Sequence, residues 1–332
     1  MMKNKQQSLM FDDLAKILNT ADSFLIASHI NPEGDSVGSV FAMEYLLHKL
    51  GKKTTVVCQD QIPGDCKFLN VSWVLYDQIK EPPQFQWAVV LDSPSIERIG
   101  SVSKLITEGS KIINIDHHIS NKYFGTCNIV APDASSCGEM LYSIFKHLGI
   151  SITKEVASFL YTAISTDTGS FRYQNTTEYT HSVISDLIHS GIDINYLNEQ
   201  LFSNISPQKI KLLERFLHNV HFSQDKTIAW SFLTNNDFLS VNAKPEDSEG
   251  FVNILRDVKG VNIAFLACEN NDSPRIKISL RSKGDSDVNK VAKIFGGGGH
   301  AKASGCTIED TLNGAVEQLL SKAQEHVASA RG

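Results

Sequence analysis

The sequence lacks several features that would assign it to common protein classes. Its six cysteines include no CxxC pair, which argues against a zinc ribbon and against a dithiol redox motif. No apolar run approaches the roughly 18 residues of a membrane span, and the N-terminal residues contain no apolar core of signal-peptide length. We therefore expect a cytoplasmic protein with reduced thiols and no membrane partner.

The chain also lacks an excess of basic residues. Its formal net charge is −6, from 31 Lys and Arg against 37 Asp and Glu. This balance does not favour a cationic groove for duplex or long single-stranded nucleic acid. A small anionic substrate remains compatible, because metal ions and a few local cations can hold it. The length of 332 residues predicts two domains.

Short apolar runs alternate with helical patterns through the first two-thirds of the chain. SFLIASHI at 23–30, KKTTVVCQ, WAVVLDS and KIINIDHH have the composition of buried strands. Helical patterns occur at 36–51, in SCGEMLYSIFKHLG and in EVASFLYTAISTD, and Ser136 and Glu139 have the spacing of a capping box. The alternation predicts an α/β domain at 1–205, with a mostly parallel sheet and helices on both faces.

The pattern changes after about residue 200. A helical segment at 206–222 is predicted to link two domains. Residues 223–332 carry KTIAWSFL, the helical EGFVNILRDVKG, two strands joined by the turn-forming NNDSP, the segment GGGGHAKASGC and a final helix. These elements predict a smaller α+β domain at 223–332.

Carboxylates and imidazoles follow the predicted strands at the points where the strands end, and one more carboxylate ends the helix before STDTG. These residues are His29, Glu33, Asp35, Asp92, Asp116, His117, His118 and Asp167. Ligands of an open parallel sheet bind beyond the carboxyl ends of its strands, so these groups should meet at one edge. Each alone has an ordinary explanation as a turn residue, but together they would repel one another without a cation. The sequence therefore predicts a metal site.

The predicted ligand set is rich in oxygen, includes imidazole and contains no thiolate. This combination suits Mn²⁺, with Mg²⁺, Co²⁺ or Fe²⁺ as alternatives, and it excludes thiolate zinc. Because there are more candidate ligands than one ion needs, we predict two ions. Two ions about 3.5–4 Å apart that share a carboxylate are typical of phosphoester hydrolysis.

Four ordered segments resemble the motifs of the DHH phosphoesterase superfamily, which includes RecJ-type nucleases, nano-RNase/phosphoadenosine-phosphate phosphatases and family II pyrophosphatases. The segments are HINPEGDSVGS, VVLDSPS, IDHH and STDTGSFRY. SLRS and GGGGHAKASGC resemble the associated C-terminal substrate-binding domain of the first two groups. The resemblance covers nearly the whole chain and is greatest to the nano-RNase type. It implies hydrolysis of very short RNAs, linear dinucleotides or 3′-phosphoadenosine 5′-phosphate.

The resemblance also implies roles for individual residues. It assigns one metal to His29, Glu33 and Asp92, and a second to Asp35, Asp92, His117 and Asp167, with Asp92 bridging. His118 would face the substrate phosphate, and Asp116 would orient an imidazole through a hydrogen bond. Glu33 departs from the family pattern, which usually has Asp at this position. Its side chain is one methylene longer, so its carboxylate is expected to reach the metal from a different distance along the chain.

The C-terminal motif is expected to bind the terminal phosphate or base of the substrate. The residues that the resemblance implies are Arg281, Gly297, Gly298, Gly299 and His300. Glycines let backbone approach an anion closely, and Arg grips phosphate through two hydrogen bonds. Ser135 and Ser136, at a predicted helix N-terminus, are further candidates for anion binding, but simple capping explains them as well. Arg172 could contact substrate or form a structural ion pair.

Three other functions stay open at this point. An inorganic pyrophosphatase is disfavoured by the C-terminal motif, and a RecJ-like exonuclease on long strands by the acidic charge balance. A non-catalytic nucleotide sensor would keep the fold without the chemistry, but the near-complete ligand set disfavours it. The resemblance also allows a homodimer.

Overall fold

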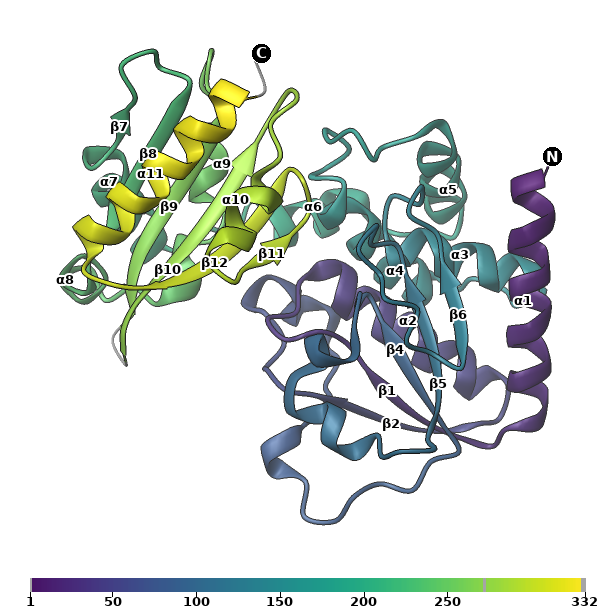
Figure 1. Cartoon of the computed structure of the whole chain (residues 1–332). Helices are drawn as coiled ribbons and strands as arrows, with labels where there is room; N and C mark the ends of the chain where they lie inside the picture. Colours follow the sequence, from purple (N-terminus) through teal and green to yellow (C-terminus); the bar gives the residue numbers. More distant parts are fainter. Residues whose placement is uncertain (1, 271–272, 330–332) are drawn as a thin grey trace. The chain divides into compact units, whose positions relative to one another are not determined.

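A six-stranded parallel sheet organises the first of the two units into which the chain divides, Met1–Asn204. The computed structural model describes residues 2–270 and 273–329. The strands are β1 (Ser23–Ala27), β2 (Lys53–Cys58), β3 (Val74–Leu75), β4 (Trp87–Leu91), β5 (Lys111–Asp116) and β6 (Cys127–Val130). They follow the order β3-β2-β1-β4-β5-β6 and all neighbours are parallel (Figure 1). The predicted α/β class is confirmed.

The strand order reverses between β1 and β4, since β2 and β3 lie on one side of β1 and the later strands on the other. Connections that leave a sheet in opposite directions open a crevice beyond the carboxyl ends of the two strands. His29 follows β1 and Asp92 follows β4. The fold therefore places two of the predicted ligands at the point where open sheets of this kind bind ligands.

Helical segments cover both faces of this sheet, but the two layers differ. The α-helices are α1 (Met2–Thr20), α2 (Gly34–Lys49), α3 (Cys137–His147), α4 (Lys154–Asp167), α5 (Glu178–His189) and α6 (Ile194–Phe202). They share the larger core with Phe24 and Ile26 of β1. The alternate residue Leu25 faces the opposite layer, where the 3-10 segment η3 (Ile96–Leu105) covers the sheet. Two further 3-10 segments, η1 (Gly64–Leu69) and η2 (Tyr76–Gln78), lie in the chain between β2 and β4.

The capping box predicted at 136 and 139 is only half formed. Ser136 caps α3, because its Oγ accepts a hydrogen bond of 3.1 Å from the Glu139 N–H. The Glu139 carboxylate is buried and does not return to Ser136; it accepts from the Ser135 hydroxyl at 2.7 Å and from the Thr180 hydroxyl at 2.6 Å. A buried carboxylate needs several donors, and these two tie the start of α3 to α5.

The second unit, Ile205–Gly332, contains a mixed sheet in the order β11-β12-β10-β9-β8-β7. Its strands are β7 (His221–Phe222), β8 (Ile228–Leu233), β9 (Ile263–Asn270), β10 (Ser273–Ser282), β11 (Gly298–Gly299) and β12 (Ala303–Glu309). Strands β8 and β9 run parallel, and the other neighbours are antiparallel. The smaller α+β domain is therefore present as predicted. Residues 271–272 of the predicted turn NNDSP lie outside the described residues.

Helices pack on both faces of the second sheet. They are α7 (Pro207–His218), α8 (Asn235–Ser240), α9 (Phe251–Asp257), α10 (Val288–Ile294) and α11 (Leu312–Ser329), with the 3-10 segment η4 (Pro245–Ser248). Leu212 and Phe216 of α7 are buried in the same core as Phe251 of α9, whereas α10 and α11 share a separate core on the other face. Of the helices in the described parts of the chain, none is both long and apolar enough to cross a membrane.

Candidate metal centre

Strand and helix ends bring the predicted ligands of the second metal together around His117. Asp92 follows β4, His117 follows β5, Asp167 ends α4 and Asp35 lies in the first turn of α2. The His117 Nε2 atom is 3.6 Å from both Asp92 Oδ1 and Asp167 Oδ2. It is 3.7 Å from Asp35 Oδ2. Four side chains that are far apart in the sequence thus form one buried or part-buried cluster.

The predicted ligands of the first metal form a second cluster that shares Asp92. His29, Glu33 and Asp92 each offer one ligand atom, and these atoms lie within 4.8 Å of one another. His29 Nε2 is 3.2 Å from Asp92 Oδ2, and Ser36 Oγ lies 2.7 Å from that nitrogen and 2.9 Å from that oxygen. Glu33 is exposed at the N-terminal boundary of α2, so its longer side chain reaches the cluster from the solvent side.

Asp92 lies between the two clusters in a left-handed backbone conformation, with φ of 52°. Its Oδ2 faces His29, whereas its Oδ1 faces His117. Left-handed backbone is uncommon outside glycine, and Asp is among the residues that tolerate it. The strained turn after β4 thus presents the two oxygens of one buried carboxylate to two different sets of ligands.

Asp35 is held in place by the start of α3. Its Oδ2 accepts from the Cys137 N–H at 2.8 Å, and its Oδ1 accepts from the Gly138 N–H at 2.9 Å. The N-terminal end of a helix favours a negative charge, so α3 stabilises this carboxylate electrostatically. Helix α2 can approach α4 because Gly38 has no side chain, since a Cβ there would lie 2.2 Å from the Phe159 carbonyl oxygen.

His118 has a different environment from His117. Its Nδ1 is 2.6 Å from Asp116 Oδ1 and 3.7 Å from Asp92 Oδ1. Asp116 is fully buried, and the carboxylate fixes the orientation of the imidazole. His117 thus faces three carboxylates of the cluster, whereas His118 is oriented by Asp116. Asp92, His117 and His118 also each offer a ligand atom within 4.8 Å of one another.

Burial and mutual repulsion raise the pKa values of two of the clustered carboxylates, Asp35 and Asp167, whereas the pKa of Asp92 is lowered. Burial, aided by the negative charge of Asp92, raises the pKa of Asp35 to about 7. Burial also raises the pKa of Asp167 well above its usual range, against the opposing charge of His117. The pKa of Asp92 is instead held well below its usual range, because its interactions with His117 and His29 outweigh the effect of burial.

The histidines of the clusters are shifted towards the protonated form. Burial opposes this shift, but the contact with the Asp92 carboxylate raises the pKa of His29 to about 9. The pKa of His117 is raised well above its usual value by Asp92, Asp167 and Asp35, again against the effect of burial. In the metal-free protein, protons on His29 and His117 thus balance part of the negative charge of the carboxylates, and divalent cations can take the place of these protons. Carboxylate oxygen and imidazole nitrogen are donors that such cations accept, so the residues fit a metal centre.

The metal-free protein should lose stability as the pH rises. Between about pH 4 and pH 7, Asp35 holds a proton in the folded protein but not in the unfolded chain. His29 does the same between about pH 6.5 and pH 9. In both windows folding takes up protons, so the free energy of unfolding falls with rising pH. Thermal unfolding in EDTA across this range measures the decline.

Divalent metal should oppose this trend, because metal binding displaces the same protons and becomes stronger as the pH rises. A metal concentration 100 times the Kd stabilises a folded protein by about 2.7 kcal/mol. The difference in Tm between samples with Mn²⁺ and with EDTA should therefore widen from about pH 6 to pH 8. Coincident melting curves at every pH would contradict a metal centre in this protein.

The substrate-binding residues predicted in the second unit lie on adjacent strands. Arg281 of β10 pairs with Ala303 of β12, and Gly299 of β11 pairs with Ser304. His300 occupies the turn between β11 and β12, where its N–H donates to the Ala303 carbonyl oxygen at 2.7 Å. The structure thus brings Arg281, the glycine segment and His300 together within the second unit.

The three glycines of that segment have different structural requirements. A Cβ at Gly297 would lie 2.2 Å from the Gly305 carbonyl oxygen, and one at Gly299 would lie 2.5 Å from the Ala303 carbonyl oxygen. These two positions need glycine for strand packing. A Cβ at Gly298 would meet its nearest neighbour at 4.0 Å, so there is open space beside Gly298.

The weaker candidates have local roles. Ser135 donates its hydroxyl proton to Glu139, and Ser136 caps α3, so both serine side chains serve the helix. Arg172 Nε donates to the Gly169 carbonyl oxygen at 2.8 Å. Sequence patterns did not point to Ser36 or to Asn175, whose Nδ2 donates to the Asp167 carbonyl oxygen at 3.1 Å. Each also has a partner far along the chain, Asp92 for Ser36 and Ser135 for Asn175, so no local spacing identifies them.

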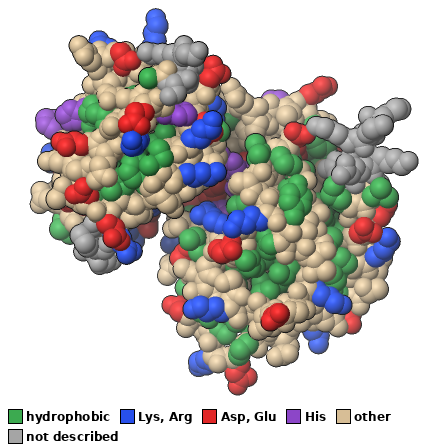
Figure 2. All heavy atoms as spheres, viewed as in Figure 1, with side chains coloured by type: hydrophobic (Ala, Val, Ile, Leu, Met, Phe, Trp, Pro, Cys, Tyr) green, Lys and Arg blue, Asp and Glu red, His purple; other side chains and the backbone are tan. Residues whose placement is uncertain are grey.

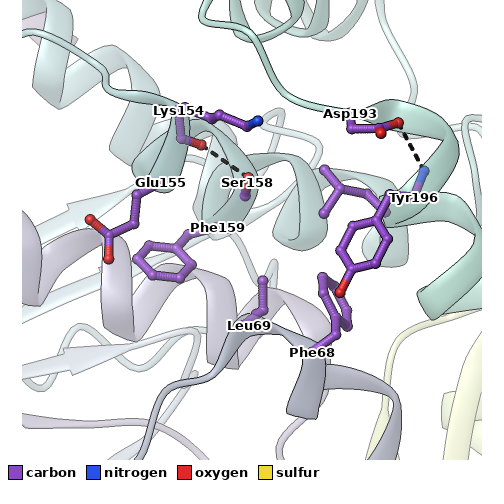
Figure 3. A pocket seen from close by; sticks show the side chains of 9 residues that line it. Phe68, Leu69, Lys154, Glu155, Ser158, Phe159, Asp193 and Tyr196 are labelled. Carbon is purple, nitrogen blue, oxygen red and sulfur yellow. Dashed lines mark hydrogen bonds between the residues drawn. The ribbon is translucent and has the colours of Figure 1, made fainter.

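A cavity of about 580 Å³ lies elsewhere in the first unit (Figure 3). Its lining residues are Phe68, Leu69, Lys154, Glu155, Ser158, Phe159, Asp193, Tyr196 and Leu197. None of these is a predicted site residue. Asp193 accepts from the Tyr196 N–H at 3.0 Å, and Ser158 donates to the Lys154 carbonyl oxygen at 3.0 Å, so these polar groups serve the helices.

Comparison with known proteins assigns both parts of the chain to described families. Residues 23–164 match the DHH family, N-terminal domain, and residues 227–329 match the DHHA1 domain. A crystal structure of an exopolyphosphatase-related protein from Bacteroides fragilis has a TM-score of 0.91, at 29% identity, and covers 98% of each chain. RecJ from Thermus thermophilus in complex with Mn²⁺ shares the fold with a TM-score of 0.56 at 11% identity, over 99% of this chain and 55% of that chain.

Curated relatives match over almost their full length. The bifunctional oligoribonuclease and PAP phosphatase NrnA of Thermus thermophilus is 30% identical over 319 residues, which are 96% of this chain and 94% of the relative. The protein of the same name from Bacillus subtilis is 26% identical, over 96% of this chain and 100% of the relative. The chain therefore belongs to the DHH family of phosphoesterases and carries a DHHA1 domain after its DHH domain.

Proposed function

We propose that this phosphoesterase hydrolyses short oligoribonucleotides, linear dinucleotides and 3′-phosphoadenosine 5′-phosphate with two bound Mn²⁺ ions. The observation that carries the proposal is the position of Asp92, whose two oxygens face two clusters of ligand-type side chains. Relatives named bifunctional oligoribonuclease and PAP phosphatase support the substrate class. The Mn²⁺-bound RecJ structure has the same fold.

The clusters suggest which residues hold each ion. His29, Glu33 and Asp92 would bind one ion, and Asp35, Asp92, His117 and Asp167 would bind the other. The bound ions would supply positive charge for the phosphoryl oxygens and would acidify a water molecule. Mn²⁺ suits the mixture of carboxylate and imidazole, and Mg²⁺ or Co²⁺ would also be accommodated.

His118 would contact the substrate phosphate, and Asp116 would hold the His118 ring in place. Asp116 accepts from His118 Nδ1 at 2.6 Å, which fixes the orientation of the ring. The oriented ring, 3.7 Å from Asp92 Oδ1, can interact with a phosphoryl oxygen as negative charge develops there. We assign this electrostatic role to His118 and an orienting role to Asp116.

Binding of the substrate's far end would fall to the DHHA1 domain. Arg281 can grip a phosphate through two hydrogen bonds, and the open space beside Gly298 lets an anionic group approach the backbone. His300 lies in the adjoining turn. The formal net charge of −6 supports a short substrate over a long polyanion. Figure 2 shows both acidic and basic side chains on the visible surface of each unit.

A substrate panel tests the proposed function. A 5-mer RNA, a linear dinucleotide, phosphoadenosine phosphate, pyrophosphate and a long single-stranded DNA are each incubated with the protein and Mn²⁺, with EDTA as the control. We expect hydrolysis of the first three, and EDTA should abolish it. Cleavage confined to pyrophosphate or to long DNA would identify the protein as a pyrophosphatase or a RecJ-like exonuclease. Binding without cleavage of any substrate would indicate a nucleotide sensor.

Replacing Arg281 by Ala should weaken substrate binding by roughly 10- to 100-fold, because a charge-assisted hydrogen bond contributes about 1.5–3 kcal/mol. The effect should fall mainly on KM, since Arg281 is assigned to the far end of the substrate. Arg275→Ala is the matched control: it removes an exposed Arg of the same strand that pairs with Glu309. Unchanged KM and kcat in Arg281→Ala would remove this residue from the site.

A further inference from the structure

A buried asparagine occupies the middle of β5, where an apolar residue is the usual choice. Asn114 is fully buried between Ile113 and Ile115, whose side chains belong to the main core. A buried amide in a central strand is costly unless its donors and acceptors are satisfied, so its partners indicate why it is there. Those partners belong to the two turns that carry Asp92 and the histidine pair.

Asn114 holds the turn that contains Asp92. Its Nδ2 donates to the Val90 carbonyl oxygen at 3.3 Å and to the Ser93 carbonyl oxygen at 3.1 Å. These two carbonyls lie on either side of Asp92, the residue with the left-handed backbone. One amide group thus holds the backbone on both sides of Asp92, and a left-handed conformation persists only where its surroundings hold it in this way.

Asn121 joins Asn114 to the turn that contains the histidines. Its Nδ2 donates to Asn114 Oδ1 at 2.8 Å and to Asp116 Oδ2 at 2.6 Å, and its Oδ1 accepts from the Tyr123 N–H at 2.6 Å. The orientation of this amide is unambiguous, because a flipped group would set its oxygen against two acceptors. All of its side-chain hydrogen-bonding groups are therefore used.

The Asp116 carboxylate links Asn121 to His118. Oδ2 accepts from Asn121, and Oδ1 lies 2.6 Å from His118 Nδ1. A carboxylate that is held through one oxygen cannot rotate, so the other oxygen fixes the imidazole. The main chain adds a second tie, since the Asn121 N–H donates to the His118 carbonyl oxygen at 3.1 Å.

We propose that Asn121 is a positioning residue for the reaction. Through Asp116 it orients His118, and through Asn114 it fixes the turn of Asp92, so that the imidazole and the shared carboxylate keep one relative geometry. The side chain of Asn121 contacts Asn114, Asp116 and the Tyr123 N–H, and it belongs to neither ligand cluster. The proposal rests on the proposed function for its kinetic consequences, but its structural consequence is independent of any substrate.

Asn121→Ala should lower kcat on the order of 10- to 100-fold with KM changed by less than about 3-fold, the range found when partners of active-site ligands are removed. The second variant is Asn121→Asp, whose side chain has almost the shape of Asn. It places a carboxylate beside that of Asp116, so its kcat should fall at least as much as that of Asn121→Ala. The control is Asn128→Ala: Asn128 pairs with Asn114 across the sheet, but its side chain closes a turn with Gly125. Its kcat should stay within about 3-fold of the wild type.

A double variant separates positioning from general destabilisation. If Asn121 acts through Asp116, the fold-decrease in kcat of the double variant Asn121→Ala/Asp116→Ala should be much smaller than the product of the fold-decreases of the two single variants. Independent structural damage would give the product. A kcat for Asn121→Ala within about 3-fold of the wild type, a loss equal to that of Asn128→Ala, or a fully multiplicative double variant would each overturn the proposal.

An NMR signal decides the structural part without a substrate. The short contact between His118 Nδ1 and Asp116 should give a downfield imidazole N–H resonance in the Mg²⁺-loaded wild type, assigned by its loss in His118→Ala. We expect the resonance to persist in Asn128→Ala and to disappear in Asn121→Ala. Its absence from the wild type or its persistence in Asn121→Ala would overturn the proposal. If the wild type cleaves no substrate of the panel, the proposed function fails while this result still stands.

Discussion

Asp92→Asn should reduce hydrolysis on the order of 10³-fold or more on every substrate that the wild type cleaves. Removing a single electrostatic contact at a reacting centre costs about 10²–10³ in kcat, and Asp92 belongs to both of the predicted metal clusters. The substitution keeps the shape of the side chain but removes its charge. Steady-state assays with saturating Mn²⁺ measure the loss.

The control for Asp92 is a carboxylate at the same edge of the sheet that belongs to neither cluster. Asp60 follows β2 and accepts from the Asn31 N–H at 2.7 Å. Asp60→Asn should lose less than about 10-fold, since Asp60 belongs to neither cluster and the Asn side-chain oxygen can accept the same hydrogen bond from the Asn31 N–H. Near-normal hydrolysis by a folded Asp92→Asn protein would contradict the assignment of both metals.

Asp167→Asn should make the metal-free protein more stable while it removes most of the activity. The pKa of Asp167 is raised well above its usual range, so the folded state disfavours its ionised form. A neutral amide removes this cost, which is about 1.4 kcal/mol for each unit by which the pKa is raised. At pH 8 in EDTA the variant should therefore melt at a higher temperature than the wild type.

Whether Asp167→Asn melts above or below the wild type should depend on both the pH and the presence of metal. As the pH falls, wild-type Asp167 takes up a proton and the advantage of the variant should shrink. With Mn²⁺ the order should reverse, because only the wild type keeps the full set of ligands. Asp186→Asn is the control: hydrogen bonds from Tyr142 and Lys146 hold the pKa of Asp186 below its usual value, so this variant should gain nothing in EDTA. If Asp167→Asn melts below the wild type in EDTA at pH 8, the folded protein does not disfavour the ionised form of Asp167, which would contradict this account.

The positions of the candidate ligands could be predicted because they follow from topology. In a parallel sheet with helical connections, the carboxyl ends of successive strands meet at one edge, so residues after β1, β4 and β5 must approach one another. The two histidines could be distinguished only by resemblance, since spacing alone does not decide which faces the carboxylates. The structure adds the contact of His118 Nδ1 with Asp116 at 2.6 Å.

Contacts that depend on distant partners could not be predicted. Glu139 has the spacing of a capping box with Ser136, but its burial leads it to the Ser135 and Thr180 hydroxyls instead. Asn121 looks like an ordinary loop residue in the sequence, and its importance appears only once Asn114 and Asp116 lie beside it. Hydrogen-bond geometry in three dimensions, not local periodicity, decides such cases.

Anomalous scattering from crystals grown with Mn²⁺ tests the central claim most directly, because it locates the ions without relying on activity. We predict two ions about 3.5–4 Å apart with Asp92 between them. One should contact His29 and Glu33, and the other Asp35, His117 and Asp167. A single ion, or two ions that do not share Asp92, would contradict a two-metal phosphoesterase centre of this design.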